Sequence, residues 1–365
     1  MNAGLTIAFF GSSLVSAYWN GAATYYRGII RALHALGHKI TFYEPDAYDR
    51  QAYRDLTDPD YADVVVYNAH REDDALQMVE DASHADILVK TSGVGVFDEL
   101  LEAAVLDKKN SHNLVFFWDV DAPATLDRLR HNPTDPFRRL IPQYDAIFTY
   151  GGGPPIVREY MRLEAQGCYP IYNAVDPHTH HPVEPDRRFL GDCGFLGHRL
   201  PDREERVEEF FFKPAAALAE KRFLLGGNGW DDKPMTPNID YVRYVSPAAH
   251  NAFNCTLCSV LNINRSSMAS TGFSPPTRVF EAAGAGACLI TDAWDGIELF
   301  LEPGREVLVA ADGDEVIAHL ADLDEERAHT IGEAARRRVL SEHTYRQRAA
   351  QFTQILEGAL RQPVL

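Results

Sequence analysis

Short apolar runs alternate with longer amphipathic stretches along this chain, and this alternation limits the possible folds more than any other feature. Residues 5–10 form an apolar run, and the stretch that follows repeats apolar residues at helical spacing as far as Leu36. Gly37 ends this helix, and residues 38–43 form the next apolar run. A strand–helix–strand unit requires parallel pairing of its strands, so the sequence predicts an α/β domain.

Further apolar runs in the first half of the chain are expected to be buried strands. They are residues 64–67, 87–90, 114–118 and 146–149. Polar residues, glycines or prolines follow each run. Ligands of open α/β sheets bind at the carboxyl ends of the strands, so we expect the functional residues of this half in those loops.

Residues 173–185, which are rich in proline and histidine, interrupt the alternation and are typical of a linker. The alternation starts again beyond them, with apolar runs at residues 223–225, 241–245, 257–263 and 287–291. The chain is therefore expected to form one domain from residues 1–172 and a second from residues 173–344. A cleft between two such domains is the usual place for a ligand.

The composition fits two domains of this size and opposes some classes of function. The chain has 365 residues, 45% of them hydrophobic, which is enough for two cores. No run is long enough to span a membrane, and the first residues lack the features of a signal peptide. The five cysteines are scattered and odd in number, so we expect a cytoplasmic location. The net charge of −18 opposes binding to nucleic acid or to an anionic membrane.

Residues 274–286 (SPPTRVFEAAGAG) carry the strongest chemical signal. Ser274 is a good N-cap, and Pro275 suits the first turn of a helix that continues through Thr277. The free N–H groups at such a helix start form an anion site, and Glu281 lies further on by roughly 10 Å along the axis. This spacing suits a pyrophosphate at the helix start and a ribose diol at Glu281. The alternative is an ordinary capped helix with a solvated glutamate.

This segment resembles the nucleotide-sugar-binding segment of GT-B glycosyltransferases (glycosyl transferases group 1), particularly the spore-maturation CgeB-like group. Other segments similar to that group are residues 150–153 (YGGG), 172–176 (YNAVD), 261–265 (LNINR) and 343–345 (HTY). The resemblance implies a GT-B fold, in which two Rossmann-like domains face each other across a cleft. It also implies an acceptor-binding first domain, a nucleotide-sugar-binding second domain, and a C-terminal helix within 345–365 that packs back on the first.

The resemblance assigns roles to single residues of the second domain. It maps the ribose-binding glutamate of the family onto Glu281. Many retaining members carry another glutamate eight positions earlier, where this chain has Phe273, so the contact to the donor sugar and the stereochemistry stay open. Val245 occupies the place where related enzymes hold the base through backbone groups.

Arginines and glycines near the same edge are the other donor-site candidates. Arg265 and Arg278 flank the proposed helix start, and the planar fork of arginine binds phosphate oxygens in pairs. The resemblance implies that Gly197 and Arg199 belong to a loop that faces the phosphates of the donor. Gly227 lies in a glycine-rich turn that could admit a nucleotide backbone closely. The alternatives are a surface turn with solvated arginines and a plain strand-end turn.

The first domain offers candidates for the acceptor side. Asp121 is the first candidate for a general base that accepts the proton of an acceptor hydroxyl, and Asp119 is the second. The alternative for either is a helix-capping aspartate. Candidates on the acceptor and transferred-sugar side are the loop residues Trp19, Asn20 and Gly21, together with Gly152.

No metal and no other cofactor is expected. His178, His180 and His181 lie on the linker without a cysteine or acidic partner at metal-site spacing, and Cys255 and Cys258 form a lone pair. The resemblance implies that protein groups, and not a metal, neutralise the departing diphosphate.

The expected activity is glycosyl transfer from a nucleotide-sugar donor to a small-molecule or glycan acceptor, without a nucleic-acid partner. The alternatives are another GT-B sugar-nucleotide enzyme, such as an epimerase, and a non-catalytic two-lobed binding protein. An NAD-dependent oxidoreductase is disfavoured, because residues 11–16 (GSSLVS) lack the G-x-G-x-x-G pattern.

Overall fold

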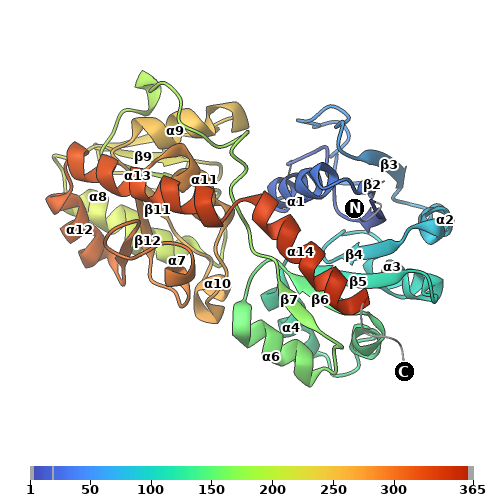
Figure 1. The fold of residues 1–365 in the computed structure, drawn as a ribbon. Coiled ribbons are helices and arrows are strands. Elements are labelled where there is room, and N and C mark those ends of the chain that lie inside the picture. The colour runs from blue at the N-terminus through green and yellow to red at the C-terminus, as the bar shows by residue number, and fades with distance from the viewer. Residues whose placement is uncertain (1–3, 19, 361–365) are drawn as a thin grey trace. The chain divides into compact units, whose positions relative to one another are not determined.

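The computed structural model describes residues 4–18 and 20–360, and the chain separates into two compact units. The first unit comprises Met1–Tyr172 and Tyr345–Leu365, and the second comprises Asn173–Thr344. Each unit contains one parallel sheet together with helices (Figure 1). The chain therefore has the two-domain α/β architecture that the sequence predicts.

The sheet of the first unit has seven parallel strands in the order β3-β2-β1-β4-β5-β6-β7. The strands are β1 (Thr6–Phe10), β2 (Lys39–Asp46), β3 (Asp63–Asn68), β4 (Ile87–Thr91), β5 (Leu114–Asp119), β6 (Ala146–Thr149) and β7 (Cys168–Pro170). The strand order reverses between β1 and β4. In open α/β sheets, ligands bind beyond the carboxyl ends of the strands at such a reversal.

The last helix of the chain completes the first unit. The helices of this unit are α1 (Ala23–Ala35), α2 (Glu72–Asp81), α3 (Asp98–Ala104), α4 (Ala122–His131), α5 (Phe137–Leu140), α6 (Gly153–Arg162) and α14 (Tyr345–Leu360). Helix α14 packs on α1 (Figure 1). Gly28 permits this approach, because a Cβ atom there would lie 2.2 Å from the ring of Tyr345.

The second unit has six parallel strands in the order β10-β9-β8-β11-β12-β13. The strands are β8 (Cys193–Leu196), β9 (Phe223–Gly226), β10 (Ile239–Val242), β11 (Ser259–Asn262), β12 (Leu289–Asp292) and β13 (Leu308–Ala310). The helices are α7 (Glu204–Val207), α8 (Lys213–Ala217), α9 (His250–Thr256), α10 (Ser266–Thr271), α11 (Thr277–Ala285), α12 (Gly313–Asp322) and α13 (Glu325–Glu342). The strand order reverses between β8 and β11, so the loops after these two strands form the expected ligand edge.

The sequence predicts most of these strands but not all of them. It predicts neither β7 nor β13, because a strand of three residues shows too little periodicity to stand out. Strand β10 ends at Val242, so Val245 lies in the loop beyond the strand instead of at its end.

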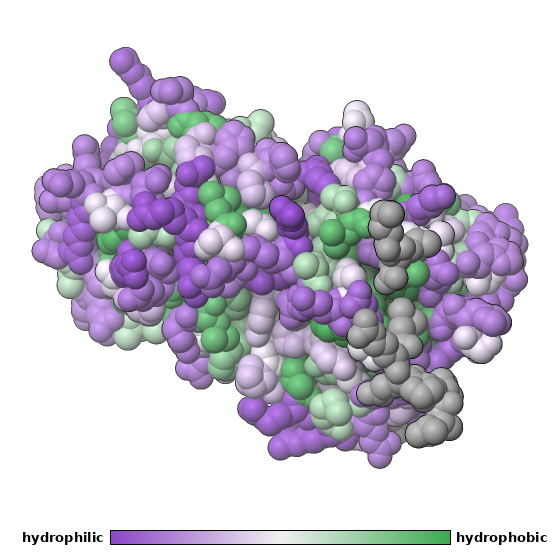
Figure 2. Space-filling view, in the orientation of Figure 1, coloured by the Kyte–Doolittle hydropathy of each residue, from purple (hydrophilic) through white to green (hydrophobic). Residues whose placement is uncertain are grey.

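The surface agrees with the composition. On the face drawn in Figure 2, most residues are hydrophilic, and hydrophobic residues appear in small patches. Among the described residues, none of the helices combines the length and the apolar character that crossing a membrane requires.

Candidate functional site

Two loops that contain glycine lie close together at the carboxyl edge of the second sheet. The N–H of Gly197, after β8, donates to the carbonyl of Gly226 at 2.8 Å. Gly227 has a φ of +120°, and a Cβ atom on it would lie 2.3 Å from the carbonyl oxygen of Gly197. Both predicted glycines therefore lie at this edge, where Gly227 leaves no room for a side chain between the loops.

Two half-buried arginines lie over one aromatic ring at the same edge. The guanidinium carbons of Arg203 and Arg278 each lie 5.5 Å from the ring centroid of Phe195, in β8. Burial and then the charge of Arg203 lower the pKa of Arg278 to about 10. Burial also lowers the pKa of Arg203. Neither arginine forms an ion pair within the part of the chain that the structure describes. The two cations repel each other, and an anion between them would relieve that repulsion.

Helix α11 begins at Thr277, later than the sequence suggests. Its N-cap is Pro276, which has a ψ of 155° and makes no side-chain cap. A residue before proline avoids the helical region, so Ser274 and Pro275 are both held outside the helix. The expectation that Ser274 is the N-cap and Pro275 the first helical residue is therefore wrong. The first N–H groups of α11 still lack helical partners, and Arg278 lies in the first turn beside them.

The hydroxyl of Ser274 nevertheless lies in this site as a buried group. Ser274 is buried, and its Oγ has no hydrogen-bond partner within residues 4–18 and 20–360. The nearby turn is held in place by Asn173, whose side-chain amide donates to the carbonyl of Pro275 at 3.0 Å. A buried hydroxyl without a partner costs free energy unless a ligand or water satisfies it.

Glu281 lies one turn further along α11, roughly 6 Å from Thr277 along the axis. Its side chain is 18% exposed, and Oε1 lies 3.9 Å from Nε2 of His180. The imidazole of His250 is hydrogen-bonded to the backbone of Val245, and burial lowers its pKa. Val245 is itself buried. Glu281 and Val245 thus lie at the same edge as Arg203 and Arg278.

Two of the predicted phosphate-binding arginines are already paired with carboxylates. Arg199 contacts Glu204 and Asp232, each at 2.7 Å. Arg265 donates from Nε to Asp202 at 2.8 Å. These carboxylates neutralise the two arginines and weaken their attraction for phosphate. Arg203 and Arg278, by contrast, form no ion pair with the described residues.

Asp119 is a buried group that organises loops at the carboxyl edge of the first sheet. Its carboxylate accepts hydrogen bonds from Ser92 at 2.7 Å, from Tyr160 at 2.5 Å and from Thr125 at 3.1 Å. Its side chain also accepts from the N–H of Asp121 at 3.0 Å. Burial raises the pKa of Asp119. A carboxylate enclosed in this way fits a positioning role, and it cannot reach an acceptor hydroxyl.

Asp121 differs from Asp119 in its surroundings. It occupies the N-cap position of α4, yet its side chain makes no cap hydrogen bond to the helix. The side chain is half-buried, so a ligand can reach it. The capping alternative therefore does not explain this residue, and Asp121 stays the first candidate for the acceptor-side base.

The remaining candidates of the first unit shape or stabilise the backbone of its loops. Asn20 is buried, and its side-chain amide donates to the carbonyls of Ser13 at 2.8 Å and Ser16 at 3.1 Å. A Cβ atom on Gly21 would meet nothing within 4 Å, so this loop position is open. Gly152 has a φ of +87°, and a Cβ atom there would lie 2.0 Å from Ile156. Trp19 lies outside the described residues.

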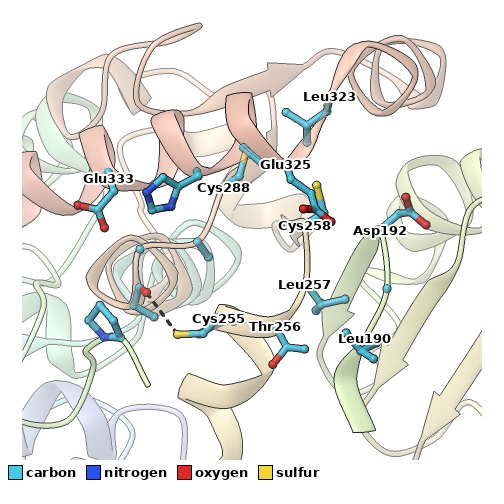
Figure 3. A pocket seen from close by; sticks show the side chains of 18 of the residues that line it. Leu190, Asp192, Cys255, Thr256, Leu257, Cys258, Cys288, Leu323, Glu325 and Glu333 are labelled. Atoms are coloured by element: carbon cyan, nitrogen blue, oxygen red, sulfur yellow. Dashed lines mark hydrogen bonds between the residues drawn. The ribbon is translucent and has the colours of Figure 1, made fainter. Parts of the chain in front are cut away.

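A separate pocket of about 780 Å³ lies at the opposite edge of the second sheet (Figure 3). Its walls come from the segments that lead into β8, β11 and β12 and from the start of α13. Cys255 donates from its thiol to the carbonyl of Ala285 there, at 3.4 Å. Burial raises the pKa values of Cys255 and Cys258, so both thiols stay protonated at neutral pH. All five cysteines are free. This pocket lies at the amino ends of the strands and at the C-terminal end of α11, away from the first turn of α11 and Arg278.

The comparisons with known proteins agree with this fold. Residues 203–354 match the family model described as glycosyl transferase-like. No curated protein matches the chain. The solved structure of a sucrose-phosphate synthase from Thermosynechococcus elongatus is similar with a TM-score of 0.69 and 12% identity, over 98% of this chain and 99% of that chain.

Two further solved structures are similar over nearly the whole chain. Anabaena Alr3699/HepE, in complex with UDP and glucose, has a TM-score of 0.67 and 11% identity, over 97% of this chain and 100% of that chain. The T4 phage β-glucosyltransferase has a TM-score of 0.61 and 13% identity, over 98% of this chain and 100% of that chain. At these identities the likeness shows the fold, and that fold is GT-B.

Proposed function

We propose that this GT-B glycosyltransferase, which takes its sugar from a nucleotide-sugar donor, binds that donor at the β8/β11 edge of its second unit. The diphosphate would lie at the start of α11 between Arg203 and Arg278, and the ribose would lie at Glu281. One observation carries the proposal: two half-buried arginines over Phe195 form no ion pair in the described residues. A diphosphate has the charge that such a pair lacks.

The same groups supply the chemistry of the transfer. As the bond between the sugar and the diphosphate breaks, negative charge grows on the departing phosphate oxygens. Two guanidinium groups and the free N–H groups of α11 are fixed beside the proposed diphosphate position, so they stabilise that charge without rearrangement. Asp121, which lies in the first unit, would accept the proton of the attacking acceptor hydroxyl.

The donor in this proposal is UDP-glucose, and the enzyme is of the CgeB-like group. Support for the donor comes from the solved structure of Alr3699/HepE with UDP-glucose, which is similar in fold. Support for the group comes from the segments that resemble it. The free cysteines favour a reducing, cytoplasmic location.

The donor proposal predicts which arginine matters. Replacing Arg278 by glutamine removes one charged contact to the diphosphate, and such contacts contribute about 1.5–3 kcal/mol. Calorimetric titration with UDP should therefore show at least about tenfold weaker binding by Arg278→Gln, and Glu281→Ala should also weaken it. Arg222→Gln is the matched control, because Arg222 is paired with Asp240 and lines the separate pocket. Unchanged UDP affinity in a folded Arg278→Gln variant would refute the site.

We also propose that catalysis needs no divalent metal. An Asp-x-Asp pair can hold a metal beside a diphosphate, and residues 119–121 have that pattern. Here Asp119 is enclosed, and the hydrogen bonds that it accepts occupy its carboxylate, so the pair offers only Asp121. Turnover of UDP-glucose should therefore persist after exhaustive EDTA treatment. Activity that is lost on chelation and returns with manganese or magnesium would contradict this proposal.

A further inference from the structure

Two tyrosines form an exposed stack at the carboxyl edge of the first sheet. Tyr18 lies in the loop after β1, and Tyr53 lies in the loop after β2. Their ring centroids are 4.2 Å apart with an interplanar angle of 21°, and the residues are 38% and 55% exposed. Tyrosine rings usually bury much of their surface, so an exposed pair at a ligand edge indicates a contact with a partner.

Polar contacts hold the two loops side by side. The hydroxyl of Ser16 donates to the carbonyl of Tyr53 at 2.8 Å, and the N–H of Ala17 donates to Asp55 at 2.9 Å. Asp55 is in turn paired with Arg27 of α1 at 2.8 Å. Because these contacts fix both loops, little conformational entropy remains to be lost when a ligand binds to the stack.

A third exposed tyrosine lies in the same loop system. Tyr48 is 54% exposed, and its hydroxyl donates to the carbonyl of Gly95, after β4, at 2.7 Å. Tyr48 and Asp49 both have a φ of 57°, in the left-handed region that non-glycine residues rarely adopt. Strain of this kind is concentrated at functional sites. The loops after β1, β2 and β4 therefore meet where the strand order reverses.

A hollow adjoins the stack. Residues 54–58, which follow Tyr53 directly, line a space of about 500 Å³. The N–H groups of Asp55 and Leu56 both donate to the carbonyl of Val15 at 3.2 Å, which ties this hollow to the loop that carries Tyr18. The stack and the hollow are thus built from the same two loops, and together they form the tyrosine platform (Tyr18, Tyr53 and residues 54–58).

The charge around the platform limits what it can bind. Residues 44–63 contain seven acidic residues and two arginines. Asp46, Asp49 and Asp60 are exposed and form no ion pair in the part of the chain that the structure describes. These carboxylates repel phosphate and sulfate groups, yet they accept hydrogen bonds from hydroxyl or ammonium groups.

We infer that the tyrosine platform binds a sugar ring of the acceptor, and that this acceptor is a neutral or amino-sugar glycan. The C–H groups on one face of a sugar ring carry partial positive charge, which suits the negative face of a tyrosine ring. The surrounding carboxylates accept hydrogen bonds from the hydroxyls of the same ring. This inference rests on the proposed function, because only a transferase needs an acceptor beside its donor.

Binding to a glycan array tests the inference directly. The full-length chain is applied, in the presence of saturating UDP, to immobilised neutral, amino, sulfated and phosphorylated oligosaccharides. The wild type should bind neutral or amino glycans. The double variant Tyr18→Ala/Tyr53→Ala should bind the same glycans roughly tenfold more weakly, because it loses both rings.

Two further variants separate stacking from folding. Tyr18→Phe/Tyr53→Phe keeps the rings and should retain binding within about twofold. Tyr169→Ala is the matched control, since Tyr169 is 39% exposed but lies on β7, at the other edge of the sheet. Binding unchanged in the double alanine variant would overturn the inference.

The remaining outcomes are equally decisive. A wild type that binds only anionic glycans, or none on the array, overturns the inference. Binding to a single-stranded DNA oligonucleotide with loss in the double alanine variant also overturns it, because it assigns the platform to a nucleic acid. UDP binding is measured separately by calorimetry, so failure of the donor proposal is distinguished from failure of the acceptor inference.

Discussion

At the scale of single residues, burial decides which charged side chains are available for chemistry. The sequence ranks Asp121 first and Asp119 second as candidates for the base, because both lie at the carboxyl end of β5. The structure separates them, because Asp119 accepts hydrogen bonds from Ser92, Tyr160 and Thr125, whereas Asp121 is half-buried. No sequence pattern could show this, since the donors to Asp119 come from three different elements.

Asp121→Asn tests the acceptor-side role. The substitution keeps the shape of the side chain and removes its basicity, so turnover should fall by about 10²–10⁴ while UDP affinity is unchanged. Asp127→Asn is the control, because Asp127 lies on the same helix and is exposed. Steady-state kinetics with UDP-glucose measures the effect. Near-normal turnover would move the base elsewhere, or would favour a retaining mechanism, which needs no such base.

At the donor site, pairing with carboxylates decides which arginines are available to a ligand. The sequence favours Arg265 and Arg278, with Arg199 as a further candidate, and it gives Arg203 no separate role, although Arg203 is only four positions after Arg199. Arg203 is available to a ligand and Arg199 is not, because Glu204 and Asp232 neutralise Arg199. Asp232 is distant in sequence, so its pairing could not be predicted. Arg278 was predictable, because it lies next to the start of a helix that the motif marks.

At the scale of elements, periodicity predicts helices and strands well and their ends poorly. The apolar repeat that Gly37 ends corresponds to α1, and the runs at 87–90 and 146–149 correspond to β4 and β6. The start of α11 was misplaced because Ser274 and Pro275 are favourable capping residues. The second proline, Pro276, overrides that preference by keeping Pro275 extended.

At the scale of the whole molecule, alternation of strands and helices was sufficient to predict two parallel α/β units. Strand order was not predictable from it, because the order depends on which strands pair across the sheet. That order places the reversals at β1/β4 and β8/β11 and so defines the two ligand edges. The tyrosine platform was missed for this reason, since Tyr18 and Tyr53 come together only through the pairing of β1 with β2.

A buried carboxylate in the first unit makes the stability of the molecule depend on pH. Glu102, on α3, is buried, and its Oε2 has no hydrogen-bond partner within the described residues. Burial raises its pKa from 4.5 to about 7; Lys90 and Arg128 oppose this rise, and Asp98 and Asp135 add to it. Between these two values the folded state keeps a proton that the unfolded state has released. The free energy of unfolding therefore falls as pH rises through this window, by roughly 3 kcal/mol at most.

Thermal unfolding at pH 5 and pH 8 measures this effect. For a unit of this size, roughly 3 kcal/mol corresponds to a decrease in Tm of roughly 6–12 °C at most between the two conditions. Glu102→Gln places a neutral amide at the same position, so its Tm should change less with pH, and at pH 8 the variant should be the more stable protein. The other carboxylates titrate in both proteins, so their contributions to the pH dependence of Tm cancel in the comparison. Parallel pH profiles for the wild type and Glu102→Gln would show that Glu102 is ionised in the folded state and that the proton is not held there.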